Sequence, residues 1–216
     1  MRPVLVLRPQ PGADATARRA AERGMRAIVT PLFQIVPKPW TLAAEPFDAV
    51  LVTSANAARQ LDARLDQSTL VYAVGSATAA ALAKAGFANH IVGDQGVEQL
   101  IAMAEAAGLK RLVHLAGEDR TSFAAGRLSI ERRIVYASEP IDPGASFGKA
   151  LAEDAVALLH SARAAARFRE LAGTGRRIAA ISPAVLAAAC EGWAATAVAS
   201  TPADEALLAA ALPLCH

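Results

Sequence analysis

The sequence predicts an α/β protein with two similar doubly wound parallel sheets, and three observations support this prediction. Short apolar runs such as Val4–Leu7 alternate with Ala-rich helical patterns, which is the order of elements that gives sheets covered on both faces. One phrase occurs twice, as DAVLVTSANA from Asp48 and as DAVALLHSAR from Asp154. In each copy the expected strand ends on a serine, Ser54 or Ser161, in a position that caps a following helix.

The repeat extends over nearly the whole chain, and its copies are separated by about half the chain length. Two further matches equate Val71–Gly75 with Ile178–Ser182, and Gly86-Phe87 with Gly192-Trp193. The repeated unit predicts a parallel sheet of about five strands with helices on both faces. From the repeat alone, two consecutive domains of about 1–107 and 108–216 are expected.

Individual elements follow from apolar runs and from their start and stop signals. The expected strands are Val4–Leu7, Arg26–Ile35, Asp48–Thr53, Leu70–Val74, Ile91–Val92, Arg111–Ala116, Arg132–Ala137, Asp154–His160, Arg177–Ile181 and Ala195–Ala199. The expected helices are Ala13–Arg23, Ala55–Leu65, Ala77–Ala85, Gly96–Ala107, Ala162–Leu171, Ser182–Glu191 and Ala203–Leu212. Glycines such as Gly24 and Gly108 close helices, and Ser182-Pro183 is a cap followed by proline at the first helical position. Ser122–Ser129 is expected as either helix or irregular chain, and two Pro-containing stretches, Pro37–Pro46 and Ser138–Gly144, as linkers.

Composition narrows the class of protein. The chain has 216 residues, 54% of them hydrophobic and 19% charged, so a sizeable core is expected. The net charge is only +2 and the arginines are scattered, so a nucleic-acid partner is not expected. No apolar run reaches the ~20 residues of a membrane span, and the first residues do not resemble a signal peptide. We therefore expect a cytoplasmic protein without membrane contact, in which Cys190 is a buried small residue and Cys215 a loose tail thiol.

Candidate site residues follow from the fold, because ligands of doubly wound sheets bind beyond the carboxyl ends of the strands. These positions carry hydroxyls, glycines and a few arginines, and they show no metal-ligand spacing, His-centred triad or Walker A loop. His114 and His160 are expected within strands as packed residues. The set therefore favours a small anionic ligand held by hydroxyls, helix N-termini and arginines. The positions are Arg8, Thr53-Ser54, Gly75-Ser76, Gly117–Arg120, Tyr136, Ser161 and Ser182.

At this point the chain resembles the uroporphyrinogen-III synthase family over nearly its full length. Although no single motif is diagnostic, the order and spacing of the motifs are specific. The motifs are LVLRP within Val4–Pro9, TPLFQIVP at Thr30–Pro37, DAVLVTSANA at Asp48–Ala57, VYAVGSATAAALAKAGF at Val71–Phe87, GEDR at Gly117–Arg120, IVYAS at Ile134–Ser138 and LLHSARAAARF at Leu158–Phe168.

The resemblance implies a cyclising lyase of haem, chlorophyll and cobalamin biosynthesis. Such an enzyme closes hydroxymethylbilane to uroporphyrinogen III, with loss of water and inversion of ring D, and uses no cofactor and no metal. We expect a monomer, since no large apolar face remains after the helices are packed, and a transient hand-over of the substrate from the preceding pathway enzyme.

The resemblance also implies a discontinuous layout of two flavodoxin-like domains with the substrate cleft between them. Residues 1–36 and 142–216 would form one domain, and residues 37–141 the other. Two crossing strands, near Gln34–Pro39 and Tyr136–Pro143, would join the domains.

The family assigns roles to several residues of this sequence. Tyr136 is expected as an acid that assists departure of the ring A hydroxyl; the alternative is an aromatic residue that packs at the end of a strand. Thr78 is expected as a hydroxyl that faces the substrate, or else as a first-turn helix residue. The expected substrate-binding residues are Arg8, Thr53, Ser54, Ala55, Asn56, Gly75, Ser76, Thr78, Gly117, Arg120, Ser161, Ala162, Arg163 and Ser182. One departure from the family is the turn Ser182–Val185, which lacks the hydroxyls that many members carry after the proline.

Two other functions stay open at this stage. A non-catalytic two-domain protein that binds or senses an anionic ligand would have the same fold, because fold alone does not decide function. An inactive paralogue is the third alternative, and the missing hydroxyls after Pro183 are the feature that favours it.

Overall fold

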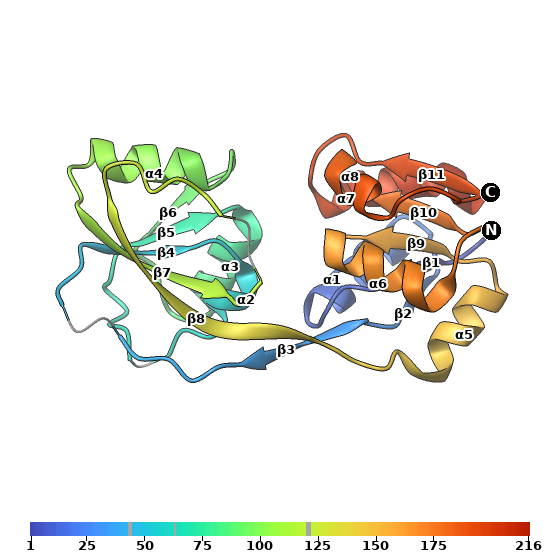
Figure 1. Cartoon of the computed structure of the whole chain (residues 1–216), viewed down its shortest axis with the longest axis horizontal. Helices are drawn as coiled ribbons and strands as arrows, with labels where there is room; N and C mark the ends of the chain where they lie inside the picture. Colours follow the sequence, from blue (N-terminus) through green and yellow to red (C-terminus); the bar gives the residue numbers. More distant parts are fainter. Residues whose placement is uncertain (43–44, 63, 120–121) are drawn as a thin grey trace. The chain divides into compact units, whose positions relative to one another are not determined.

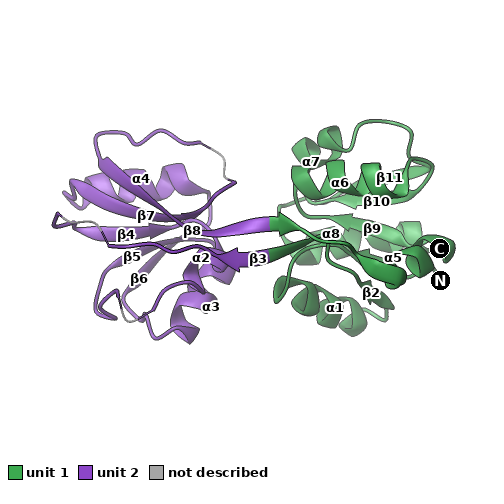
Figure 2. Ribbon diagram, turned by 60° about the horizontal axis from the view of Figure 1, so that its bottom comes forward, with its two compact units in different colours: residues 1–34, 139–216 green, residues 35–138 purple. Residues whose placement is uncertain are grey.

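The computed structural model of the chain describes residues 1–42, 45–62, 64–119 and 122–216. These residues form two compact units, which Figure 2 shows in green and purple. Unit 1 consists of residues 1–34 and 139–216, and unit 2 of residues 35–138. The family resemblance placed the corresponding boundaries after residues 36 and 141.

Unit 1 contains a five-stranded sheet with the order β11-β10-β9-β1-β2, in which all paired strands are parallel. Its strands are β1 (Val4–Val6), β2 (Ala27–Val29), β9 (Val156–Leu159), β10 (Arg177–Ala180) and β11 (Ala195–Val198). Its helices are α1 (Gly12–Glu22), α5 (Gly144–Ala152), α6 (Ala162–Ala172), α7 (Pro183–Ala188) and α8 (Asp204–Ala211), followed by a 3₁₀ turn, η1 (Leu212–Cys215).

Unit 2 is built around a six-stranded sheet with the order β3-β8-β7-β4-β5-β6. From β8 to β6 every neighbouring pair is parallel. Its strands are β3 (Phe33–Pro37), β4 (Ala49–Val52), β5 (Val71–Val74), β6 (His90–Gly93), β7 (Arg111–Gly117) and β8 (Ser129–Pro140). Its helices are α2 (Ala55–Ala58), α3 (Ser76–Lys84) and α4 (Val97–Ala106). The chain passes between the units along β3 and β8 (Figure 1).

The two sheets place repeat-related strands in the same order. The order β2-β1-β9-β10-β11 in unit 1 corresponds to β8-β7-β4-β5-β6 in unit 2. Apart from β3, which is added at the edge of the unit 2 sheet, each sheet therefore takes two strands from one copy of the repeat and three from the other. The prediction of an α/β fold with parallel sheets is confirmed, whereas the two consecutive domains expected from the repeat alone are wrong because the copies are exchanged between the sheets.

Several element boundaries differ from the prediction. The expected strand Arg26–Ile35 is divided into β2 and β3 around Pro31, which has no N–H for a ladder hydrogen bond. The helix expected to reach Leu65 is the single turn α2. Beyond the end of α2, the Asp62 carboxylate accepts a hydrogen bond from the backbone N–H of Arg64 at 3.0 Å.

The second linker is shorter than expected, and one helix after it was missed. Strand β8 continues to Pro140, and helix α5 covers a stretch to which the sequence analysis assigned no element. Helix α5 contains Gly144 and Gly148, which have low helix propensity, and it is stabilised by the burial of Phe147 and Ala150. The segment 122–128 that precedes β8 contains no helix or strand.

The cysteine prediction was reversed. Cys215 is completely buried in the core of unit 1, where its thiol donates a hydrogen bond to the carbonyl of Ala211 at 3.4 Å. Cys190 is exposed and adopts a left-handed backbone conformation with φ of +58° just after α7. Because the terminal turn η1 packs against the same core as β1, the tail of the chain is part of the core. Within the described residues, no helix is long and apolar enough to cross a membrane.

The central strands are buried on both faces. All residues of β1, β4 and β9 are inaccessible to solvent, as expected for parallel strands between two layers of helices. On one face of the unit 1 sheet, Phe168 packs edge-on against Phe147 and is stacked on Trp193, with ring centroids 6.0 and 5.8 Å apart. This aromatic group connects α5, α6 and the loop before β11.

We predict that Phe168→Ala lowers the free energy of unfolding of unit 1 by about 3–5 kcal/mol, because it removes a fully buried ring from a packed core. Trp193 reports this unit and Trp40 the other, so unfolding by denaturant is followed by Trp193 fluorescence in a Trp40→Phe background. Leu171→Ala, on the same helix but 41% exposed, is the control and should change little. Equal effects of both variants would contradict the assigned packing.

Candidate functional site

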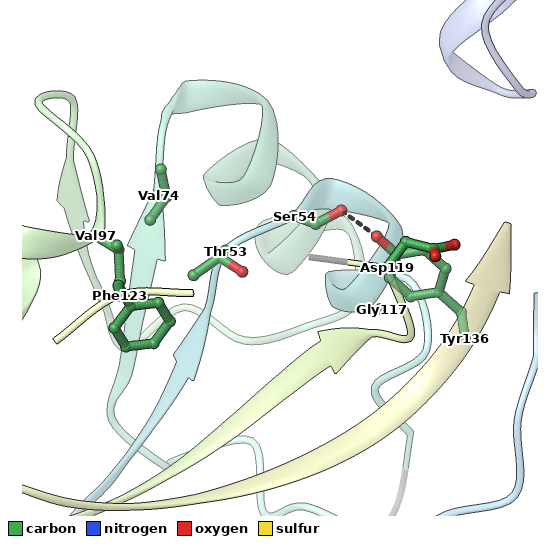
Figure 3. Close-up of a pocket in the computed structure, with 8 residues that line it drawn as sticks. All are labelled: Thr53, Ser54, Val74, Val97, Gly117, Asp119, Phe123 and Tyr136. Atoms are coloured by element: carbon green, nitrogen blue, oxygen red, sulfur yellow. Dashed lines mark hydrogen bonds between the residues drawn. The ribbon is translucent and has the colours of Figure 1, made fainter. Parts of the chain in front are cut away.

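A pocket lies in unit 2 at the carboxyl ends of β4, β5 and β7 (Figure 3). Its volume is about 270 Å³. Parallel strands bring residues from distant parts of the chain together at this edge of the sheet. The described residues that line the pocket are Thr53, Ser54, Val74, Val97, Gly117, Asp119, Phe123 and Tyr136.

Ser54 and Tyr136 form the polar pair of this pocket. Ser54 is the N-cap of α2, and its hydroxyl oxygen accepts a hydrogen bond from the N–H of Asn56 at 3.1 Å. The same oxygen lies 3.1 Å from the phenol oxygen of Tyr136 on β8. Either hydroxyl can be the donor in this contact, and when Ser54 donates, the tyrosine keeps its own proton for a ligand.

Gly117 provides the space that Tyr136 occupies. A Cβ atom at this position would lie 2.6 Å from Cζ of the tyrosine ring, closer than a real contact allows. The ladder between β7 and β8 is also irregular at Ala116 and Gly117, where Gly117 pairs with Tyr136. The glycine and the bulge therefore direct the tyrosine ring toward Ser54.

A second polar contact joins Thr53, which lines the pocket, to a buried histidine. The Thr53 hydroxyl oxygen is 3.0 Å from Nε2 of His114, a residue of β7 that is 2% exposed. The His114 ring makes an edge contact with Phe123, with centroids 5.2 Å apart. Phe123, Val74 and Val97 give the pocket an apolar side opposite its hydroxyl groups.

The other residues predicted for this edge lie near the pocket but are not among its described lining residues. Ala55 and Asn56 form the first turn of α2, and Gly75, Ser76 and Thr78 the start of α3. Gly75 has a φ of +77°, which favours glycine, and among the described residues no side chain caps α3. Thr78 is 3% exposed, which fits the first-turn helix alternative better than a hydroxyl that faces a ligand. Arg120 lies outside the described residues.

Unit 1 carries the remaining predicted residues at the corresponding edge of its own sheet. Ser161 and Ser182 cap α6 and α7, with hydroxyl oxygens that accept hydrogen bonds from backbone N–H groups at 3.2 and 3.3 Å. Ala162 and Arg163 are exposed in the first turn of α6, and the Arg163 guanidinium lies over the Phe33 ring at 4.7 Å. The capping predictions for Ser54, Ser161 and Ser182 are confirmed.

Arg8 belongs to a cluster around a buried carboxylate that the sequence analysis missed. The Asp204 side chain, at the start of α8, is 9% exposed. It accepts hydrogen bonds from the Thr16 hydroxyl at 2.9 Å, from His160 Nε2 at 2.8 Å and from Arg19 at 2.9 Å. An Arg8 nitrogen lies 3.6 Å from the same carboxylate. His160 was expected within a strand as a packed residue. It lies directly after β9, and its ring is hydrogen-bonded to Asp204.

The electrostatics of this cluster favour a neutral histidine beside an ionised aspartate. Burial lowers the pKa of His160, and this effect outweighs the hydrogen bond to Asp204 that raises it. Burial alone would raise the pKa of Asp204, but the hydrogen bonds from His160 and Thr16 and the positive charge of Arg8 lower that pKa to about 2. His160 therefore donates from Nε2, and the carboxylate is held by donors on three sides.

Comparison with known proteins shows where this chain belongs. The family model described as "Uroporphyrinogen-III synthase HemD" matches residues 14–209. The chain belongs to the uroporphyrinogen-III synthase family. This match includes every described residue that lines the pocket of unit 2. The family resemblance found in the sequence is confirmed.

Solved structures share the fold of this family member. A uroporphyrinogen-III synthetase from Helicobacter pylori 26695 is 20% identical, with a TM-score of 0.66 over 99% of this chain and 100% of the other. A mutant uroporphyrinogen III synthase from the extremely thermophilic bacterium Thermus thermophilus is 17% identical, with a TM-score of 0.52 over 97% of this chain and 96% of the other. No curated protein sequence gives a significant match.

Some residues of the family member's site had no distinctive signal in the sequence. Val74 is at the end of β5, Val97 is at the start of α4 and Phe123 is in the irregular segment before β8, and these residue types are common in cores. Asp119 belongs to the range Gly117–Arg120, which was selected for its place after a strand, but it was given no role of its own. For Asp204 the available signal was an acidic residue in the first turn of a helix, but its partners come from α1 and from the residue after β9, which are distant in sequence.

The site of unit 2 offers hydroxyl groups, a carboxylate and an apolar wall. A tyrosine hydroxyl held by a serine can donate a hydrogen bond to an oxygen of a bound molecule. In the part of the chain that the structure describes, no three His, Cys, Asp or Glu side chains are grouped as a metal site.

We predict that Asp204→Asn lowers the free energy of unfolding of unit 1 by roughly 2 kcal/mol near neutral pH, which corresponds to the difference between the native and ordinary pKa values. Because the native pKa is the lower one, this stabilisation is present above about pH 4 and is lost as the pH falls toward 2. The difference between wild type and variant should therefore shrink between about pH 4 and pH 2 in denaturant titrations. Glu205→Gln, a neighbour that is 55% exposed, serves as the control. A difference independent of pH would contradict the assignment.

Proposed function

We propose that this protein is a uroporphyrinogen-III synthase that cyclises hydroxymethylbilane to uroporphyrinogen III with loss of water and inversion of ring D. The observation that carries the proposal is the family match over residues 14–209, which includes a pocket with a serine-held tyrosine at the carboxyl edge of a parallel sheet. The strand order of the two sheets further supports two flavodoxin-like domains.

Tyr136 is proposed as the group that assists departure of the hydroxyl from ring A. The C–O bond of the hydroxymethyl group breaks, the oxygen leaves as water, and the ring nitrogen loses its proton to give a neutral azafulvene. The phenol donates a hydrogen bond to the leaving oxygen, while Ser54 fixes its position at 3.1 Å. Since a pyrrole-methanol loses its hydroxyl readily, this help is modest.

The rest of the site binds and orients the substrate. The substrate carries eight carboxylates, which hydroxyls and helix N-termini hold through hydrogen bonds. Helix α3 begins at Gly75 without a side-chain cap from the described residues, so its first N–H groups point to solvent or to a ligand. In unit 1, Ser161 and Arg163 stand at the N-terminus of α6 and are exposed. These groups are proposed carboxylate partners.

Control of conformation is the larger part of the catalysis in this proposal. The azafulvene is reactive, and the linear chain closes without inversion when its ends meet in solution. The enzyme must therefore hold the chain so that the far ring attacks at its substituted position and passes through a spiro intermediate. Binding groups spread along the substrate achieve this by restricting its freedom before the bond forms.

We predict that the purified protein converts freshly prepared hydroxymethylbilane mainly to the type III macrocycle. The measurement is separation of the two isomers by chromatography after oxidation, with heat-denatured protein as the control. Accumulation of the type I isomer alone, at the rate of the control, would support the non-catalytic anion-binding alternative and rule out this proposal.

We predict that Tyr136→Phe lowers kcat about tenfold with little change in KM, less than the roughly 10²–10⁴ typical of a general acid because the leaving group departs readily. The substitution removes only the hydroxyl bonded to Ser54. Tyr72→Phe is the matched control: Tyr72 is the other tyrosine of the chain, lies on β5 and is 1% exposed. If both variants keep the kcat of the wild type, Tyr136 has no role in the chemical step.

A further inference from the structure

The hydroxyl of Thr53 has a buried partner, and the protonation of that partner decides what the hydroxyl can offer a ligand. Thr53 lines the pocket of unit 2, and its oxygen lies 3.0 Å from His114 Nε2. A threonine hydroxyl has a single proton. If Nε2 carries a proton, the histidine donates and Thr53 keeps its own proton for the pocket. If Nε2 is bare, the Thr53 proton is used in the bond to His114.

The surroundings of His114 fix the ring in place. The residue is in the middle of β7 and is 2% exposed, and its ring meets the edge of Phe123. Thr53 is only partly buried and lines the pocket, so its hydroxyl can bond to the histidine and also face a ligand. Val74, Val97 and Phe123 line the same pocket and place apolar surface beside Thr53.

Unit 1 shows what the equivalent position does when a carboxylate is present. In the repeat, His160-Ser161 occupies the place of Thr53-Ser54, directly after the strand and before the helix. His160 donates from Nε2 to the buried carboxylate of Asp204 at 2.8 Å. In unit 2 the position belongs to Thr53, which lies in an open pocket.

We propose that His114 is a positioning residue that donates from Nε2 to Thr53, so that the Thr53 hydroxyl donates in turn to a carboxylate of the bound tetrapyrrole. This inference rests on the proposed function for the identity of the ligand. It assigns to Thr53 the role that His160 has toward Asp204, with the substrate supplying the carboxylate. The Nε2–H form is the one consistent with a polyanionic ligand, because a bare Nε2 would leave only lone pairs of Thr53 facing it.

The first test reads the tautomer without using activity. The chain has four histidines, so the ¹⁵N shifts and couplings of the imidazoles can be assigned by comparison with His114→Gln. We expect His114 to carry a proton on Nε2. A neutral ring with its proton on Nδ1 would overturn the proposal, whatever the enzyme assay shows.

The second test measures whether His114 acts through Thr53. We expect Thr53→Val and His114→Leu each to raise KM for hydroxymethylbilane about fivefold to tenfold with kcat nearly unchanged, as for loss of one hydrogen bond to a charged group. The double variant should be no worse than either single one. His114→Gln can still donate to Thr53 and should recover most of the affinity, which also separates this role from a purely structural one.

A control variant and a direct binding measurement complete the test. Thr30→Val removes another buried threonine hydroxyl, one that donates to the carbonyl of Pro143 at 3.1 Å, and should leave KM unchanged. Titration with uroporphyrin III measures carboxylate binding directly and should show the same ranking of variants. Additive effects of Thr53→Val and His114→Leu would overturn the coupling. A wild-type protein that binds uroporphyrin III but makes no type III isomer would contradict the proposed function while leaving the assignment of His114 in place.

Discussion

Burial of the central strands on both faces is the constraint on which the rest of this structure depends. Strands β1, β4 and β9 are inaccessible to solvent throughout, so their side chains are available for packing alone. Most of the polar contacts described above therefore lie near the points where the chain leaves the sheet. After β4, β9 and β10 the backbone begins a helix whose first N–H groups need partners, and Ser54, Ser161 and Ser182 each accept a hydrogen bond from one of them.

The two sheets use their exits in different ways. In unit 1 the carboxyl edge is filled by Asp204, whose charge is satisfied by donors from α1, from the residue after β9 and from the loop after β1. In unit 2 the corresponding edge contains a pocket. Thr53 is shorter than His160, and Gly117, which has no side chain, leaves room for the ring of Tyr136 at the pocket wall. The same backbone thus supports a closed polar cluster in one place and a ligand pocket in the other.

Local signals explain why much of the fold could be predicted. The serine caps, the apolar strands and the glycines that close helices act within a few residues, and the repeat made the sheets recognisable. Tyr136, Ser54, Thr53 and Gly117 were singled out by position and family likeness. Their grouping around one pocket is visible only in the structure, because the contacts join strands that are far apart in sequence.

Other features depend on distant contacts and had no local signal. In the sequence, Asp204 is only an acidic residue in the first turn of a helix. The structure shows that Thr16 and His160 are hydrogen-bonded to its carboxylate. Helix α5 was hidden by its glycines, and α2 ends at Ala58, short of the expected Leu65. His114 was expected to be a packed strand residue, and it is buried in β7. Its Nε2 atom is also hydrogen-bonded to Thr53, which follows the neighbouring strand β4.

The exchange of strands between the repeats has a consequence for synthesis of the chain. Unit 2 is one continuous segment, residues 35–138, and all its parts leave the ribosome in sequence. Unit 1 cannot form until β9 emerges, because β1 lies between β2 and β9 in its sheet. The first 34 residues must therefore wait, with their apolar strand exposed, while the middle of the chain folds. Residues 1–34 are therefore synthesised before unit 2 but reach their final packing only after residues 139–216 have been made.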